Sequence, residues 1–198
     1  DECLDMKGIL NKKIYELTIK NSKFIGIIIP IKSKEDIRER LNELKAEYKN
    51  ATHYCYAFTL INDKGFSDDG EPNKTAGIPI LNVIEGNDLV NVLMVVIRYF
   101  GGIKLGPGGL IRAYSQATKE VINKSTLINL VNGLEVSITF DYSKEKEVNY
   151  LLKNSIIKSK DYEQNCTYII ETTKDILDSI SNLVTINYIH EKIIPKIN

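Results

Sequence analysis

A glycine-dense segment, residues 98–114, carries the most distinctive chemistry in the sequence. It reads RYFGGIKLGPGGLIRAY, with five glycines within nine residues. Because glycine lacks a Cβ, such a segment can turn sharply and bring its backbone close to another surface. Where it opens a helix, free N–H groups and the positive end of the helix dipole can bind a phosphate or a carboxylate. The sequence therefore predicts an anion site made of Arg98, Gly101, Gly102, Lys104, Gly106, Gly108, Gly109 and Arg112.

The same segment also has a purely structural interpretation. Its glycines would permit a tight crossover from a strand to a helix, with Tyr99, Phe100 and Tyr114 packed in the core. The spacing matches neither the phosphate loop that ends in Gly-Lys-Ser/Thr nor the dinucleotide-binding fingerprint with its downstream acid. Spacing alone leaves both the anion site and the structural crossover open.

A second segment, residues 66–77, gathers negative charge. It reads FSDDGEPNKTAG and places Asp68, Asp69 and Glu71 within four residues. Carboxylates this close repel each other unless a cation or helix N–H groups face them. One interpretation is that they orient the cations of the glycine segment, or hold Mg²⁺ jointly with a phosphate.

The acidic segment has a simpler interpretation as well. It can be a turn whose carboxylates are solvated, or paired with Arg98 and Arg112. The spacing is not that of a calcium loop, so no metal ligand is assigned. We expect no cofactor, with Mg²⁺ as the one candidate.

His53 and Cys55 lie two residues apart, and therefore on one face of a predicted strand. They could act as a base and a nucleophile. The only other histidine is remote in the sequence, and there is no G-x-S-x-G nucleophile elbow. We therefore interpret this pair as part of a half-buried strand face and assign no catalytic residue. On the opposite face, Tyr54, Tyr56 and Phe58 are interpreted as core and not as a platform for stacking bases.

The elements that must position these groups form a first α+β unit, and residues 130–133 are expected to connect it to a second unit. Alternating apolar residues predict strands, spacings of three to four predict helices, and glycine- or proline-rich stretches predict turns. In order, the sequence predicts strands at 13–20 and 23–32, a helix starting at 33–36, a strand at 53–61, a loop at 62–75, a helix at 77–85, a strand at 89–98, a turn at 99–109 and a helix at about 110–125.

The second unit has a different order of elements. The predicted elements are a strand at 134–142, a helix at 143–154, strands at 156–161 and 166–172, a helix at 174–183 and a strand at 184–190. This is the βαββαβ order of ferredoxin-like domains. The strand at 166–172 lacks the aromatic pattern of an RNA-recognition motif, so the order does not by itself imply RNA binding. We expect two domains, 1–132 and 133–198.

Composition restricts the classes of partner. The 198 residues include 26 basic and 26 acidic side chains, which cancel to a formal charge of zero. A general duplex binder is therefore disfavoured, and any nucleic-acid contact must be local. Cys3, Cys55 and Cys166 form no CxxC pair, which indicates neither disulfides nor zinc and fits a reducing cytoplasm. No apolar run approaches the roughly 20 residues that span a bilayer, so no membrane partner is expected.

The two chemical segments together resemble the signature of the YigZ/IMPACT family. The stretch FSDDGEP, the Thr75-Ala76-Gly77 triplet followed by Pro79, and RYFGGIKLGPGGLIRAY are similar to family sequences nearly residue for residue. The resemblance extends from residues 22–25 to residue 114, and the second unit is similar to the smaller C-terminal domain of bacterial members. One departure is Asn73-Lys74, where the family commonly has a small residue and a glycine, which bears on the local turn.

The resemblance implies a fold. The first domain would have the left-handed βαβ fold of the second domain of a small-subunit ribosomal protein, and the second domain would be ferredoxin-like. Together these domains are similar to the last two domains of elongation factor G. Both comparisons point to the ribosome.

The resemblance also implies a function. Eukaryotic IMPACT proteins are translational regulators that compete for the activator of a kinase acting on initiation factor 2. They do so with an additional N-terminal domain, so that protein partner does not carry over. We expect a cytoplasmic, non-enzymatic regulator that binds structured RNA or the ribosome through the anion site, with a translation factor or regulatory protein as a possible partner.

Two other function classes stay open at this point. Kinases of sugars and homoserine share the implied first fold and bind ATP phosphates at a glycine-rich helix start. A Mg²⁺-dependent phosphotransferase or hydrolase acting on a phosphorylated small molecule or nucleotide is therefore the enzymatic alternative. The other is a protein-binding module whose acidic loop docks on a basic partner.

Overall fold

The computed structural model describes residues 5–196, and the chain divides into two compact units between Ile128 and Asn129. The fold is α+β, as expected. The division lies inside a long strand, β7 (Leu127–Phe140), four residues before the expected boundary. The prediction of a connection at 130–133 is wrong, because these residues pair with the last strand of the chain. Asn132 and Gly133 look like turn residues in the sequence, but tertiary pairing overrides that preference.

The first unit contains a five-stranded sheet in the order β2-β3-β6-β4-β5, and every neighbouring pair is antiparallel. Because β3 and β4 both run antiparallel to β6, they are parallel to each other and form a βαβ crossover through the first helix. A short strand, β1 (Met6–Ile9), precedes the sheet. The sheet strands are β2 (Lys13–Ile19), β3 (Ser22–Pro30), β4 (His53–Leu60), β5 (Asp63–Ser67) and β6 (Val92–Tyr99).

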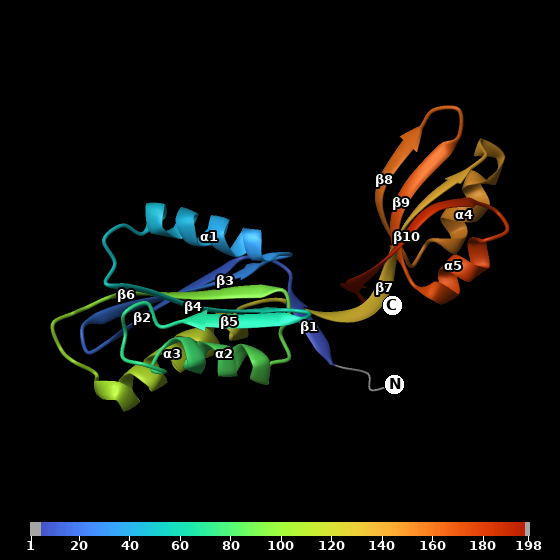
Figure 1. Cartoon of the computed structure of the whole chain (residues 1–198). Helices are drawn as coiled ribbons and strands as arrows, with labels where there is room; N and C mark the ends of the chain where they lie inside the picture. Colours follow the sequence, from blue (N-terminus) through green and yellow to red (C-terminus); the bar gives the residue numbers. More distant parts are fainter. Residues whose placement is uncertain (1–4, 197–198) are drawn as a thin grey trace. The chain divides into compact units, whose positions relative to one another are not determined.

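One helix lies on one face of this sheet and two helices cover the other (Figure 1). Helix α1 (Lys34–Glu47) starts with the predicted cap: Asp36 N–H donates to Ser33 Oγ at 3.5 Å, and the Asp36 carboxylate accepts from Ser33 N–H at 3.2 Å. These bonds satisfy N–H groups that no helical carbonyl can reach. Its buried side chains pack on one sheet face.

The other face is covered by α2 (Gly77–Gly86) and α3 (Gly106–Asn123). Alternate residues of β6 enter the two cores, so this strand is buried on both faces, as its nearly continuous apolar sequence predicts. Helix α3 begins four residues earlier than predicted and includes three of the glycines. Pro107 in the first turn explains this start, because proline's fixed φ suits a helix and its missing N–H is not needed there.

Part of the predicted loop at 62–75 is in fact the edge strand β5, which pairs with β4. Gly65 suggested a loop, but it faces Phe58: a Cβ at this glycine would lie 2.6 Å from the Phe58 ring. The strand therefore needs a residue without a side chain at this point. The acidic segment starts where β5 ends, which fixes its position at one end of the sheet.

The second unit has the predicted ferredoxin-like topology. Its strands are ordered β10-β7-β9-β8, with every pair antiparallel, which corresponds to the 4-1-3-2 order of a βαββαβ chain. No helix within residues 5–196 is long and apolar enough to cross a membrane. The remaining elements are the 3₁₀ turn η1 (Tyr142–Lys144), α4 (Glu145–Leu151), β8 (Ile156–Tyr162), β9 (Cys166–Thr172), α5 (Lys174–Ile180) and β10 (Thr185–Pro195).

Candidate functional site

The glycine turn connects the end of β6 to the start of α3. Gly101 approaches the turn between β2 and β3 so closely that a Cβ on it would lie 2.1 Å from the carbonyl carbon and oxygen of Asn21. Gly106 has φ of 74°, a left-handed conformation that favours glycine. The close approach expected from the glycines is therefore real, and the surface that Gly101 approaches belongs to the chain itself.

The start of α3 is open to solvent. Leu105 at the N-cap makes no side-chain capping bond, and Gly106 and Gly108 are exposed, as is Gly102 in the preceding loop. The first turn of α3 consists of residues 106–109. In the part of the chain that the structure describes, no side chain caps its free N–H groups.

Two of the predicted cations lie at this helix start. Lys104 and Arg112 are exposed, and neither forms an ion pair within residues 5–196. A Cβ at Gly108 would lie 3.4 Å from Arg112 Nη1, so the guanidinium rests beside the open first turn. Exposed amide donors and two mobile cations are thus brought together at one helix end.

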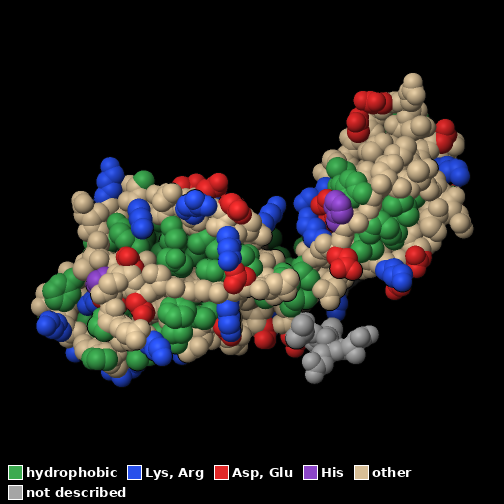
Figure 2. Space-filling model, in the orientation of Figure 1, with side chains coloured by type: hydrophobic (Ala, Val, Ile, Leu, Met, Phe, Trp, Pro, Cys, Tyr) green, Lys and Arg blue, Asp and Glu red, His purple; other side chains and the backbone are tan. Residues whose placement is uncertain are grey.

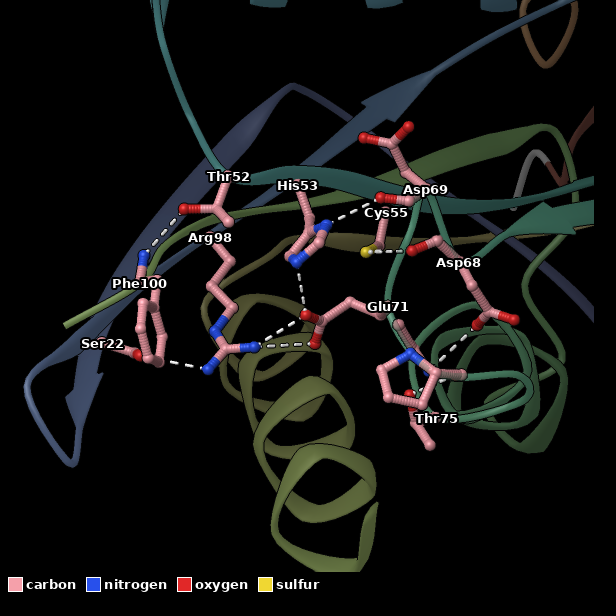
Figure 3. Close-up of polar contacts among 12 residues, drawn as sticks. Ser22, Thr52, His53, Cys55, Asp68, Asp69, Glu71, Thr75, Arg98 and Phe100 are labelled. Carbon is pink, nitrogen blue, oxygen red and sulfur yellow. Dashed lines mark hydrogen bonds and ion pairs between the residues drawn. The ribbon is translucent and has the colours of Figure 1, made fainter. Parts of the chain in front are cut away.

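Arg98, the third predicted cation, is not mobile. It is 4% exposed, and its Nη1 donates to both carboxylate oxygens of Glu71, at 2.7 and 2.9 Å (Figure 3). Its Nη2 donates to Ser22 Oγ at 3.3 Å, and its guanidinium lies 5.4 Å from the ring centroids of Phe24 and Phe100. The prediction that Arg98 serves the anion site is therefore corrected: its charge is used inside the protein.

The Arg98–Glu71 pair belongs to a wider buried network. His53 Nε2 lies 2.6 Å from a Glu71 carboxylate oxygen, and His53 Nδ1 lies 2.7 Å from the Asp69 carbonyl oxygen. Ser22 Oγ also accepts from the Gly101 N–H at 3.2 Å. The network therefore joins the β2–β3 turn, β4, the acidic segment and the glycine turn.

Sequence reasoning missed Ser22 in this network and Thr52 beside it, and treated His53 only as a base for Cys55. Ser22 lies in residues 22–25, where the family resemblance begins, so the sequence marked this position. It did not show which side chains Ser22 contacts. Thr52 gave no signal: its Oγ1 accepts from Phe100 N–H at 2.9 Å and fixes the start of the glycine turn.

The three acidic side chains point in different directions. Asp68 Oδ1 accepts from the N–H groups of Ala76 and Gly77, at 3.1 and 2.8 Å, and thus satisfies free donors at the start of α2. Asp69 Oδ2 accepts from Tyr54 N–H at 2.6 Å. Of the three carboxylates only that of Glu71 contacts a predicted cation, so the expectation that Asp68 and Asp69 orient the cations is wrong.

This divergence also bears on a metal site. Among residues 5–196 no group of three or more His, Cys, Asp or Glu side chains is placed to hold a metal ion. The Asp68 carboxylate accepts from N–H groups at the start of α2, that of Asp69 from the N–H of a β4 residue, and that of Glu71 from the buried Arg98 guanidinium. The sequence predicted that these carboxylates need positively charged or N–H partners, and other residues of the same chain provide them.

Cys55 is a buried thiol. Its Sγ donates to the Asp68 carbonyl oxygen at 3.1 Å and lies 3.4 Å from the Tyr114 hydroxyl. Burial raises the pKa of the Cys55 thiol to about 12, so it stays protonated at neutral pH. The prediction that His53 and Cys55 lie on a half-buried strand face is confirmed, with Cys55 buried and His53 partly buried. Cys166 is a buried free cysteine too, and Cys3 lies outside the described residues.

The fold and this site define an α+β chain whose first unit places an exposed glycine-rich helix start above a buried Arg–Glu–His network. Residues 20–122 match the model of the Impact N-terminal domain, a stretch that contains both of these features. The chain belongs to the IMPACT family, as the sequence resemblance indicated.

Relatives extend over most of the chain. IMPACT family member YvyE of Bacillus subtilis strain 168 is 34% identical over 165 residues, which are 79% of this chain and 76% of that protein. IMPACT family member YigZ of Escherichia coli K12 is 32% identical over 139 residues, 68% of each chain. A solved structure described as a crystal structure of a hypothetical protein has a TM-score of 0.65 at 25% identity, covering 95% of this chain and 98% of its own.

Burial of Cys55 predicts that its thiol reacts slowly with alkylating reagents in the native protein. With a thiol pKa of about 12, only about one molecule in ten thousand carries the thiolate at pH 8. We expect iodoacetamide to leave Cys55 unmodified in the native protein at pH 8 and to label it fully in guanidinium chloride, as measured by peptide mass spectrometry. Rapid labelling of Cys55 in the native protein would contradict this assignment.

Loss of the Glu71 carboxylate should destabilise the fold strongly. Glu71→Gln leaves the buried Arg98 charge without a counter-ion, which typically costs about 3–5 kcal/mol. The control is Glu43→Gln, which breaks the exposed pair with Arg40 and should cost less than about 1 kcal/mol. Urea denaturation measures the free energy of unfolding of both variants. Equal values for the two would show that the buried pair does not stabilise the fold more than the exposed one.

Gly101 should not tolerate a methyl group. In Gly101→Ala the Cβ would clash with the Asn21 backbone, and such overpacking costs about 1–3 kcal/mol. The matched control is Gly108→Ala, where the Cβ meets only the flexible end of Arg112 and alanine favours the helix. Thermal denaturation should show a lower Tm for the first variant only, and an unchanged Tm for Gly101→Ala would refute the close approach.

Proposed function

We propose that this protein is a translation-associated regulator that binds structured RNA or a ribosomal surface at the start of α3. The observation that carries the proposal is the open first turn of this helix, with the Arg112 guanidinium beside it and Lys104 just before it. Uncapped N–H groups and the helix dipole favour a phosphate oxygen, and the two cations add charge-assisted hydrogen bonds. A phosphate backbone is the ligand that fits this combination best.

The electrostatics of the whole chain support a local contact. The formal charge is zero, so affinity for RNA must come from a small set of cations and not from a generally basic surface. Arg98 is excluded from this set by its pairing with Glu71. The proposed contact thus consists of Lys104, Arg112 and the backbone of residues 106–109.

Family membership supports the link to translation. The eukaryotic proteins that gave the family its name are translational regulators, as the sequence resemblance implies. Protein IMPACT of Oryctolagus cuniculus is 35% identical over 101 residues, but this chain covers only 31% of that protein. A regulatory protein partner is therefore an extension of the proposal and is not taken from that relative. The proposed place of action is the cytoplasm, where Cys55 and Cys166 would stay reduced.

The proposal is non-enzymatic because the candidate catalytic groups are already used internally. His53 is bonded to Glu71 and to the Asp69 carbonyl, and Cys55 is a protonated, buried thiol. The acidic side chains that could have served a phosphotransferase are bonded to backbone N–H groups and to Arg98. What the exposed part of the site offers is binding of an anion.

Filter binding to transfer RNA and ribosomal RNA across a salt series tests the proposal. Arg112→Ala removes one phosphate contact, so it should weaken binding and lower the slope of log affinity against log salt by about one. Lys104→Ala should have a similar effect. The control is Lys64→Ala, which removes an exposed lysine paired with Glu85 and should leave the slope unchanged. Identical slopes for Arg112→Ala and the parent would remove the site.

A further inference from the structure

A groove runs beside α1 on the sheet face opposite to α3. Its volume is about 390 Å³, and it lies between the flank of α1 and β4. Figure 2 shows hydrophobic side chains gathered in the band between α1 and the strands β4 and β5, with Lys and Arg side chains along it. The polar and aromatic residues that line the groove are Lys34, Arg38, Asn42, Lys45, Tyr56 and Phe58.

The charged side chains of this groove are cations. Lys34, Arg38 and Lys45 lie along one flank of α1, and none of the lining residues is acidic. Lys34 pairs with Asp63 at 2.6 Å. Within residues 5–196, Arg38 and Lys45 have no carboxylate partner, and Lys45 Nζ lies 5.7 Å from the centroid of the Tyr54 ring. The groove therefore presents unneutralised positive charge to a ligand.

The wall formed by β4 is aromatic. Tyr56 and Phe58 alternate along the strand, so both rings stand on the face that α1 covers. They are half-buried and pack against the core below, which confirms that they belong to the core. The expectation that they do not stack bases is a separate one, and it is tested below. They also line the groove, where a ring that is part of the core is held rigidly. Nucleic-acid bases stack on aromatic side chains irrespective of base identity.

The length of the cationic flank distinguishes a strand from a single nucleotide. Arg38 and Lys45, the two lining cations without a carboxylate partner among residues 5–196, are seven residues apart on α1, which corresponds to about 10 Å along the helix axis. One mononucleotide cannot reach both ends of this row with its phosphate. A run of phosphates on a flexible strand can, and cations that follow a backbone beside aromatic rings are typical of single-strand binding.

We propose that this groove binds unpaired nucleotides of single-stranded RNA. The bases stack at Tyr56 and Phe58, the phosphates lie against Arg38 and Lys45, and the exposed Asn42 amide bonds a base edge. This site is separate from the start of α3, because the two lie on opposite faces of the sheet. It goes beyond the proposed function and shares with it only the class of ligand.

Fluorescence anisotropy with a labelled ten-nucleotide oligoadenylate and the full chain tests the proposal. Arg38→Gln and Lys45→Gln should each weaken binding several-fold and flatten its salt dependence. Tyr56→Leu keeps an apolar side chain under α1 but loses the ring, and should weaken binding about tenfold. Tyr56→Phe retains the ring and should bind like the parent. The control on the same helix is Arg40→Gln, whose guanidinium is paired with Glu43, and it should have no effect.

Several outcomes would overturn the proposal. These are failure of the parent to bind oligoadenylate, equal binding by Arg38→Gln and the parent, and competition by AMP as effective as by the oligonucleotide. Binding of polyglutamate in place of the oligonucleotide would instead identify an acidic protein ligand and overturn it too. Arg112→Ala should leave oligoadenylate binding unchanged. If transfer RNA is not bound but oligoadenylate is, the proposed function fails while this inference stands.

Discussion

The buried ion pair between Arg98 and Glu71 is the constraint on which the geometry of the first unit depends. Arg98 is the residue of β6 that comes directly after a run of buried apolar positions, and its charge must be compensated where it lies. Glu71 supplies the compensation from a segment far away in the sequence. The pair therefore holds the acidic segment against the sheet, and His53 and Ser22 extend it to the neighbouring strands.

This arrangement separates the charges that stabilise the fold from those available to a ligand. The carboxylates of Asp68, Asp69 and Glu71 are all bonded within the unit, and so is the Arg98 guanidinium. Lys104 and Arg112 remain exposed at the start of α3. A helix start held in place by a rigid, internally paired network below it can present its amides in a fixed geometry, which lowers the entropic cost of binding an anion.

Sequence reasoning succeeded where patterns are local. The capping box at Ser33, the βαββαβ order and the doubly buried β6 can be predicted from spacing and hydrophobic pattern. It failed where a residue's role depends on a distant partner. Gly65 was interpreted as a loop residue, whereas its role is to leave room for the Phe58 ring on the neighbouring strand. The spacing of the glycine segment also does not show whether the Arg98 side chain is exposed or buried. The partners of a charged side chain are a tertiary property, so the candidate site was found as a segment but not as a network.

The contact between Gly101 and Asn21 has a consequence for how such chains diverge. Lys20 and Asn21 both have positive φ, at 45° and 64°, in a two-residue hairpin whose tip touches the loop that leads into α3. An inserted residue in that hairpin would collide with this loop, and a longer loop would lose its support. Insertions and deletions should therefore be tolerated at other surface turns, while these two segments keep their lengths together across homologous sequences.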